Sequence, residues 1–172
     1  MALPIRPETA RDAQAIAAMV TSAFAGAEHA SGDEAAIVAR LRADDALACS
    51  LVATDKSGTI VGHVAFSPVL IDRADGGASR GWFGLGPLAV AREWRRQGIG
   101  AALVEAGLAV LRNQGGAGCV VLGDVAYYRR FGFVACPGLV FDVELAPYFS
   151  ALAFAGAMPA GRVRYHAAFG TA

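Results

Sequence analysis

The chain has 172 residues, of which 55% are hydrophobic and 17% charged, and this composition excludes an intrinsically disordered protein. It carries 15 basic and 15 acidic side chains, so the formal net charge is zero. A neutral chain offers no broad basic surface, and we therefore expect neither nucleic acid nor an anionic membrane as a partner. The neutral net charge does not exclude a local basic pocket.

Two amphipathic helices are predicted near the N-terminus. After the extended segment PIRPET, Thr9 and Asp12 have the spacing of a helix-capping box, and apolar residues at helical spacing predict a helix that ends near Gly26. Ser31 and Glu34 repeat the capping pattern ahead of a second apolar stripe. The first third of the chain is therefore mainly helical.

A hairpin and a third, interrupted strand follow. Residues 46–54 and 59–71 are rich in β-branched side chains and flank the turn sequence DKSG, which predicts two antiparallel strands. Residues 72–81 are polar and glycine-rich, as expected for a loop. Residues 82–90, WFGLGPLAV, predict another strand, and Pro87 within it indicates a β-bulge because proline cannot donate a ladder hydrogen bond.

The segment EWRRQGIG leads into a helix that ends at Gly115, and residues 118–123 are apolar throughout, as in a central strand. Asp124 is placed to cap a short helix over residues 125–131. Two regions of the tail, 139–145 and 161–169, are typical of strands.

Between those two tail regions, residues 147–154 are predicted to form a helix. The chain contains no repeat and no linker, so we expect a single α/β domain with a mixed sheet over residues 1–172.

The cysteines and the N-terminal sequence indicate a reducing environment. Cys49, Cys119 and Cys136 are odd in number and form no C-x-x-C pair, so neither a disulfide framework nor a metal site is expected. The start of the chain lacks the apolar core of a signal peptide, and no apolar run is long enough to span a bilayer. These features predict a cytoplasmic location.

A candidate anion site lies where the helix after EWRRQGIG begins. Unpaired amide groups and the helix dipole attract anions at a helix N-terminus, and Gly98 and Gly100 keep side chains away from those amides. Arg95, Arg96 and Gln97 add charge and hydrogen-bond donors, and a diphosphate suits several converging donors. The alternative is that the glycines only shape a loop beside solvated arginines. Neither the third glycine of a dinucleotide-binding motif nor a Walker lysine is present.

The sequence LAVAREWRRQGIGAALVEAGL resembles the acyl-coenzyme A signature of the GNAT N-acetyltransferase superfamily. Arg95, Gly98 and Gly100 match its [QR]-x-x-G-x-[GA] motif, and Leu88 and Val90 match the L-x-V that precedes it. The sequence LGDVAYYRRFGF is similar to a subgroup of small bacterial GNAT proteins whose acceptors are mostly unassigned.

The resemblance implies a mixed, mostly antiparallel central sheet flanked by helices, in which a bulged strand opens a V-shaped cleft beside residues 118–123. Acetyl-CoA would lie in that cleft as a co-substrate, with its pantetheine arm on the bulged strand and its pyrophosphate at the helix start; no metal is implied. The residues that the resemblance assigns to acetyl-CoA are Leu88, Ala89, Val90, Arg95, Arg96, Gln97, Gly98, Ile99, Gly100 and Ala101.

The resemblance also implies a catalytic acid. In the family, the tyrosine of a Y-x-x-x-G-F motif protonates the departing thiolate, and Tyr128, Gly132 and Phe133 match that motif here. Tyr127 is the neighbouring competitor, and consecutive helical side chains diverge by about 100°, so at most one of the two should face the sulfur. Without the motif, both tyrosines would be read as edges of the core.

The general base is left open. Many relatives place a carboxylate on or beside the bulged strand, but residues 82–90 contain none. The candidates are Glu28 and His29 between the first two helices, His63 on a strand, or ordered water, and His166 is a weaker one. Each side chain has a plainer interpretation, as an exposed loop residue or as a histidine satisfied within the sheet.

The function expected from the resemblance is transfer of an acetyl group from acetyl-CoA to a primary amine of a small molecule or peptide, by direct attack on the thioester. The apolar region 22–32 favours an acceptor with some apolar bulk. A non-catalytic acyl-CoA-binding or sensing domain of the same fold is the alternative. Many relatives dimerise, so a homodimer is also expected by analogy.

Overall fold

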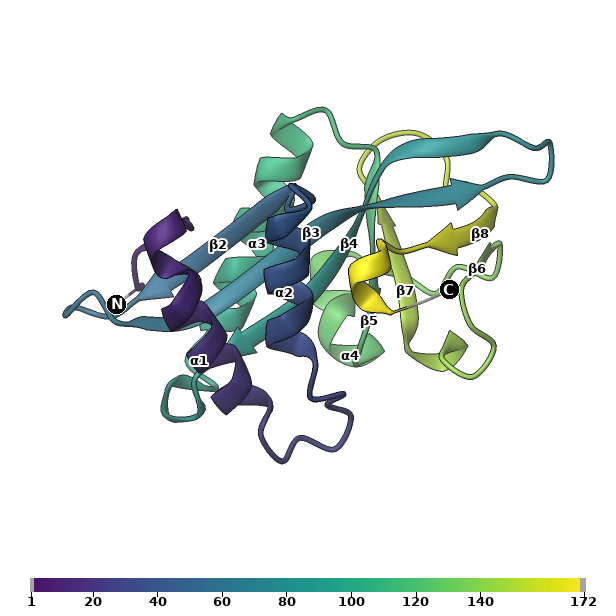
Figure 1. Ribbon diagram of the computed structural model, residues 1–172. Helices are drawn as coiled ribbons and strands as arrows, with labels where there is room; N and C mark the ends of the chain where they lie inside the picture. The colour runs from purple at the N-terminus through teal and green to yellow at the C-terminus, as the bar shows by residue number, and fades with distance from the viewer. Residues whose placement is uncertain (1, 171–172) are drawn as a thin grey trace.

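The computed structural model describes residues 2–170 and contains one mixed sheet of eight strands with helices on both faces (Figure 1). The strands run in the order β1-β2-β3-β4-β5-β7, and β8 pairs with β3 and with β6. Only the β4–β5 and β6–β8 pairs in this described sheet are parallel. The strands are β1 (Ile5–Pro7), β2 (Cys49–Thr54), β3 (Ile60–Asp72), β4 (Ala78–Val90), β5 (Gly118–Leu122), β6 (Leu139–Val140), β7 (Phe149–Ala153) and β8 (Gly161–Arg164).

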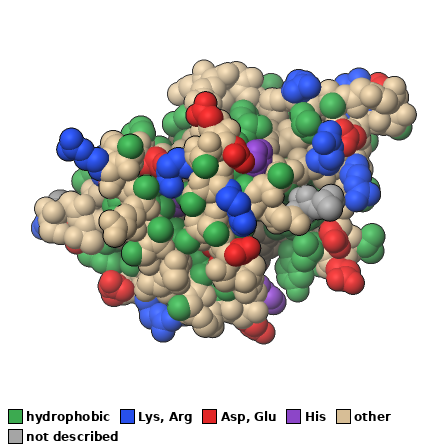
Figure 2. Space-filling model, in the orientation of Figure 1, with side chains coloured by type: hydrophobic (Ala, Val, Ile, Leu, Met, Phe, Trp, Pro, Cys, Tyr) green, Lys and Arg blue, Asp and Glu red, His purple; other side chains and the backbone are tan. Residues whose placement is uncertain are grey.

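Helices α1 (Ala13–Phe24) and α2 (Glu34–Ala43) lie in front of the sheet in Figure 1, and α3 (Ile99–Asn113) lies behind it. The short α4 (Val125–Tyr128) follows β5. On the α1 face, Ile16, Met19 and Val20 pack against strand residues of β2, β3 and β4. Basic and acidic side chains are interspersed on this face of the molecule (Figure 2). The predicted mixed, mostly antiparallel sheet flanked by helices is confirmed.

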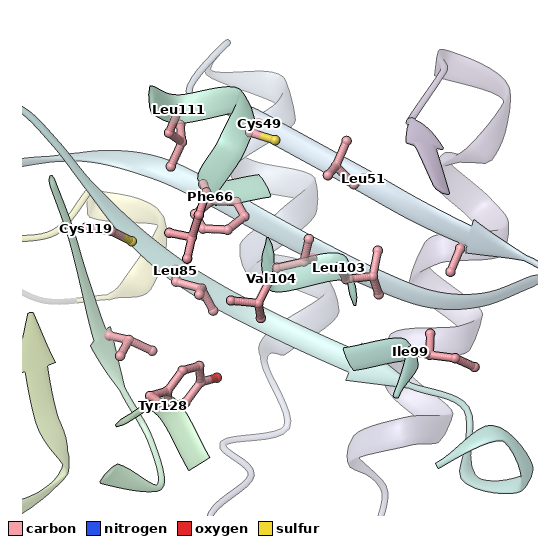
Figure 3. Packing of buried hydrophobic residues seen from close by; sticks show 14 of the residues in the cluster. Cys49, Leu51, Phe66, Leu85, Ile99, Leu103, Val104, Leu111, Cys119 and Tyr128 are labelled. Atoms are coloured by element: carbon pink, nitrogen blue, oxygen red, sulfur yellow. The ribbon is translucent and has the colours of Figure 1, made fainter. Parts of the chain in front are cut away.

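The largest cluster of buried side chains lies between the sheet and α3 (Figure 3). Leu103, Val104 and Leu111 of α3 are fully or almost fully buried against Phe66 of β3 and Leu85 of β4. Helical spacing in the sequence indicated this face of α3, because apolar residues recur every three or four positions. The packing holds α3 firmly under the sheet, so the start of the helix has a fixed place beside β4.

The predicted bulge is present in β4. Opposite β3, Leu85 pairs with Phe66 and Leu88 pairs with Val64, so β4 has one more residue than β3 between these pairs. On its other edge β4 pairs with β5 only over Trp82–Leu85. Residues 86–90 therefore leave the partner strand, and their backbone on that edge is free of the ladder.

Two sequence predictions are wrong in detail. Residues 72–81 are not a loop, since β3 continues to Asp72, β4 begins at Ala78, and only a short turn separates them. Residues 147–154 are not a helix, because β7 covers most of them and pairs antiparallel with β5 along its whole length. The free edge of β5 supplies backbone partners, and that long-range pairing overrides the local apolar pattern.

The predicted tail strands are also shorter than expected. Of residues 139–145 only β6 is strand, and of residues 161–169 only β8, which is followed by a 3-10 turn at Ala167–Phe169. The polar residues after β6 and the chain reversal after β8 end both strands early.

A polar network under α2 fixes the N-terminal strand. Arg42 Nε and Nη2 donate to the Glu8 carboxylate at 2.7 and 3.1 Å, and the Ser50 hydroxyl donates to the same group. His63 Nε2 lies 3.6 Å from Glu8 Oε2. Burial disfavours the ionised carboxylate, but His63, Arg42 and Ser50 outweigh it and lower the pKa of Glu8 to about 2.

Glu8→Gln should therefore weaken the fold in a pH-dependent way. A carboxylate whose pKa falls from 4.5 to about 2 on folding contributes about 3 kcal/mol above pH 4.5, and that contribution is lost as the pH falls toward 2. We expect the variant to lose most of this contribution to the free energy of unfolding at pH 7. In denaturant titrations from pH 7 to 2, its free energy of unfolding should fall less steeply with pH, which gives a flatter acid limb. Asp75→Asn, which removes an exposed ion pair with Arg73, is the control and should change both the stability and the acid limb far less, because solvent screens that pair. Parallel acid limbs for Glu8→Gln and the unsubstituted protein would contradict this assignment.

Candidate active site

The start of α3 presents free peptide amides. The first helical hydrogen bond runs from Ala102 N to Gly98 O over 3.0 Å, so the amides of Ile99, Gly100 and Ala101 have no acceptor within the helix. The helix dipole adds about half a positive charge at this end. An anion placed here would gain both the amide hydrogen bonds and the dipole.

Two glycines keep this helix start open. Gly98 is the N-cap residue with φ +81°, in the left-handed region that favours glycine, and a Cβ at this position would have no heavy atom within 4 Å. Gly100 lies in the first turn, where a Cβ would come 3.1 Å from the Tyr127 hydroxyl. Gly98 therefore borders open space, and Gly100 leaves room beside Tyr127 that a side chain would fill, so an anionic group can approach the amides.

These amides line a cavity of about 430 Å³, the α3 cavity, between the end of α1, the free part of β4 and the start of α3. Nine of the ten residues assigned to acetyl-CoA from the sequence lie on its wall. They are Leu88, Ala89, Val90, Arg95, Arg96, Gly98, Ile99, Gly100 and Ala101. The tenth, Gln97, lines a smaller neighbouring hollow, and its side-chain amide donates to the Glu93 carbonyl at 3.2 Å.

Arg95 is more than a charge at the rim. Its Nε donates to the Val90 carbonyl at 3.1 Å, and its Nη2 donates to the carbonyl of Ala23 near the end of α1. The guanidinium thus ties the end of β4 to α1 and fixes one corner of the α3 cavity. Arg96 has a left-handed backbone conformation, with φ +61°. Its side chain is exposed and is therefore free to reach an anion.

Arg130 and Tyr127 also line the α3 cavity, and the sequence reasoning did not assign them to it. The Arg130 guanidinium lies over the Tyr127 ring, 4.9 Å from its centroid. The sequence spacing indicates that these two residues share a face, because residues three apart in one helical turn lie together, but it does not indicate that this face lies at the start of α3. Arg130 is therefore a further cation on the wall of the α3 cavity, in addition to Arg95 and Arg96.

Tyr128 is more deeply buried than its neighbour Tyr127. Its side chain is 8% exposed and packs edge-on against the rings of Tyr127 and Phe133, at centroid distances of 5.1 and 5.8 Å. Figure 3 shows the hydroxyl on the side of the ring that faces away from β5, toward β4. Within residues 2–170 this hydroxyl has no hydrogen-bond partner. It is not completely buried, because part of the oxygen surface stays accessible.

Burial raises the pKa of Tyr128 above its ordinary value, so the phenol stays protonated at neutral pH. It can therefore donate a proton to a base that forms near it. The nearby Cys119 thiol offers no competing chemistry, because burial raises its pKa strongly. Burial also raises the pKa of Cys49, on β2, to about 11.

The four side chains considered as a general base lie in different surroundings. His63 is fully buried, with Nε2 2.9 Å from Ser50 Oγ, while its Nδ1 has no hydrogen-bond partner within residues 2–170, so only half of this ring is satisfied within the sheet. His166 accepts a hydrogen bond from the Ala168 amide and lies 3.8 Å from Asp44. Glu28 is exposed on the loop after α1. Its neighbour His29 lines a second cavity.

That second cavity, the Tyr148 cavity, has a volume of about 690 Å³. Its lining residues are His29, Leu122, Gly123, Asp124, Val125, Leu145, Pro147 and Tyr148. Both cavities use the same two segments, since Ala27 and His29 belong to the loop after α1, and Asp124 and Tyr127 to the junction of β5 and α4. The two cavities therefore share the loop after α1 and the β5–α4 junction as parts of their walls.

Residues 2–170 contain no cluster of three or more His, Cys, Asp or Glu side chains that could hold a metal ion. In the same part of the chain, no helix combines the length and the apolar character needed to cross a membrane.

Comparisons with known proteins agree with this geometry. The sequence model of the acetyltransferase (GNAT) family matches residues 14–133. The Escherichia coli K12 protein named uncharacterized N-acetyltransferase YhbS is 43% identical over 129 residues, which cover 75% of this chain and 72% of that protein.

Two solved structures are similar over almost the whole chain. A GNAT family acetyltransferase from Brucella melitensis, in complex with acetyl-CoA, is 46% identical, with a TM-score of 0.85 and 97% of each chain covered. The YhbS structure from Escherichia coli, in complex with CoA, is 36% identical, with a TM-score of 0.87 and coverage of 99% of this chain and 93% of that one. The free strand edge beside an open helix start and the match to the family sequence model agree, and the chain belongs to the GNAT family of acetyltransferases.

Proposed function

We propose that the protein transfers the acetyl group of acetyl-CoA to a primary amine, which attacks the thioester directly. The observation that carries this proposal is the continuity of the α3 cavity, which joins an anion site at a helix start to a free strand edge. Acetyl-CoA carries phosphate groups at one end and amide groups along its pantetheine arm. It therefore needs an anion site and a free strand edge side by side. The Brucella melitensis and Escherichia coli relatives were crystallised with acetyl-CoA and CoA.

The residues of this chain fit such a ligand. The amides at Ile99–Ala101 would hold the pyrophosphate, with Arg96 and Arg130 as counter-charges from two sides of the cavity. The backbone of Leu88–Val90, which β5 does not pair, would bond the pantetheine amides. Arg95 would act by holding this wall against α1 and not by contacting phosphate.

The proposed reaction needs two proton transfers. The ammonium group of the acceptor loses a proton to a base, its nitrogen forms a bond to the thioester carbonyl carbon, and the carbon–sulfur bond breaks. The sulfur leaves with the bonding electron pair and takes the phenol proton of Tyr128. The Tyr128 phenol is protonated at neutral pH and so has a proton to give. The burial that raises its pKa would also disfavour a free thiolate beside it, which keeps the transfer from phenol to sulfur feasible.

We propose His29 as the base, because among the four candidate side chains it lines a cavity that borders the β5–α4 junction. A lysine-like amine has a pKa of about 10.4, so nearly all of it is protonated at neutral pH and a base within reach should raise the rate. Ordered water would serve only if His29 lies too far from the amine.

Thiol release from acetyl-CoA in the presence of a panel of amines tests the proposed function directly. His29→Gln should lower kcat/KM for a good acceptor about 10- to 100-fold at pH 7, and the deficit should shrink as the pH rises toward the pKa of the amine. Glu28→Gln changes the adjacent exposed side chain and should have little effect. Equal losses in both variants at every pH would contradict the role of His29, and absence of amine-dependent thiol release would contradict catalysis.

The other predictions from the sequence stay predictions. They are the single domain over residues 1–172, the cytoplasmic location, the homodimer, and the lack of a nucleic-acid or membrane partner.

A further inference from the structure

The Tyr148 cavity borders the proposed acid. Gly123 forms part of its wall, and a Cβ on Gly123 would lie only 2.6 Å from Cε2 of Tyr128, so the tyrosine ring is in contact with the backbone of that wall. The loop after α1 borders the cavity through His29 and reaches the α3 cavity through Ala27. A molecule in the Tyr148 cavity would therefore lie against the backbone that contacts the Tyr128 ring, in a cavity that shares two wall segments with the α3 cavity.

Most of the wall of the Tyr148 cavity is apolar. Leu145 is 40% exposed and Tyr148 is 47% exposed, although both are large apolar side chains. The His29 ring lies 5.9 Å from the Tyr148 ring, centroid to centroid, and the two are tilted by 46°. Apolar and aromatic groups exposed around a concave surface are typical of a ligand site, because a bound apolar group would remove them from water.

Asp124 is the one carboxylate among the lining residues, and no lysine or arginine is among them. Its Oδ1 accepts from the amides of Ala126 and Tyr127 at 2.9 and 3.4 Å, which fixes the side chain as the N-cap of α4. Within residues 2–170, Oδ2 of Asp124 has no hydrogen-bond partner. A single fixed carboxylate in an apolar wall attracts one positive charge and disfavours an anionic ligand.

We propose that the Tyr148 cavity holds the acceptor, and that the acceptor is an amine with one positive charge on an apolar, preferably aromatic, body. Asp124 would pair with the ammonium group, and Tyr148, Leu145 and Pro147 would cover the body. A volume of about 690 Å³ suits a small molecule or the first residues of a peptide. Polyamines and amino sugars do not fit, because the lining offers one carboxylate and few polar groups. This inference rests on the proposed acetyl transfer.

Acceptor preference is the first test. We expect 2-phenylethylamine to be acetylated with a kcat/KM at least about 10-fold above that of ethanolamine or spermidine, since burying an aromatic group contributes a few kcal/mol. Asp124→Asn keeps the helix cap, because asparagine caps as well as aspartate, but it removes the charge, and KM for 2-phenylethylamine should rise about 10-fold. Tyr148→Ala should lower kcat/KM for the same amine by a similar factor. Val143→Ala, at an exposed position outside the cavity lining, is the matched control and should change nothing.

Binding without turnover separates this inference from the proposed function. Saturation-transfer NMR with 2-phenylethylamine and saturating CoA should give a signal that Tyr148→Ala abolishes and Asp124→Asn weakens. That result supports the acceptor site even if no thiol is released, in which case only the proposed catalysis fails. Equal binding of spermidine, or a signal that neither substitution changes, would overturn the inference whether or not the protein turns over.

Discussion

Gly100→Asp is expected to abolish CoA binding while leaving the fold at least as stable as before. Gly100 lies in the first turn of α3 and lines the α3 cavity. A carboxylate there would face the diphosphate at close range, and like charges about 4 Å apart repel by several kcal/mol at the effective dielectric constant of a protein surface. We therefore expect Kd for CoA to rise about 100-fold or more.

The same substitution should help the helix. Aspartate in a first turn interacts favourably with the helix dipole, and glycine is a poor helix former, so the free energy of unfolding should stay constant or rise by up to about 1 kcal/mol. The new Cβ would come 3.1 Å from the Tyr127 hydroxyl, the mobile end of a side chain, which a small shift relieves. Opposite effects on folding and on binding would distinguish an anion site from a merely structural turn.

Thermal unfolding with and without CoA measures both effects. At 100 times its Kd, CoA should stabilise the unsubstituted protein by about 2.7 kcal/mol, and at the same concentration a variant with 100-fold weaker binding should gain only about 0.4 kcal/mol. Gly100→Asn has nearly the same bulk without the charge and should lose much less affinity. If CoA stabilises Gly100→Asp as much as the unsubstituted protein, the diphosphate does not bind at this helix start.

The open helix start at which we propose an anion site was predictable because its parts are local. Gly98, Gly100 and the arginines before them lie within a few residues of one helix start, so spacing alone indicated their arrangement. The bulge in β4 was equally local, since Pro87 cannot take part in a regular ladder. In both cases the conformation of a short segment decides the structure.

Features that depend on distant segments were not predictable. Residues 147–154 have a helix-compatible pattern, and only the free edge of β5 makes most of them a strand. Arg130 lines the α3 cavity because the segment after β5 brings Tyr127 and Arg130 to the start of α3, and Arg95 bonds to the end of α1, 72 residues away in the chain. The Tyr148 cavity combines three distant segments, so no single stretch of sequence carried its signal.

Tyr128→Phe is expected to lower kcat by about 100-fold or more with little change in KM for acetyl-CoA. The departing sulfur is a thiolate whose conjugate acid has a pKa of about 8.5, and a placed acid contributes 100- to 10,000-fold in such steps. Phenylalanine keeps the ring that packs against Phe133 and Gly123, and within the described residues the hydroxyl has no hydrogen bond to lose. Stability should therefore change by no more than about 0.5 kcal/mol.

Tyr127→Phe is the matched control, because the two tyrosines are adjacent but face different surroundings. Tyr127 lines the α3 cavity beside Gly100 and Arg130, so the loss of its hydroxyl should raise KM for acetyl-CoA a few-fold and leave kcat nearly unchanged. Steady-state kinetics with acetyl-CoA and a good amine separate the two outcomes. A large fall in kcat for Tyr127→Phe, with none for Tyr128→Phe, would transfer the acid role to Tyr127. The buried phenol beside β5 would then be only a core residue, and the direction in which each hydroxyl points would decide which of two adjacent tyrosines does the chemistry.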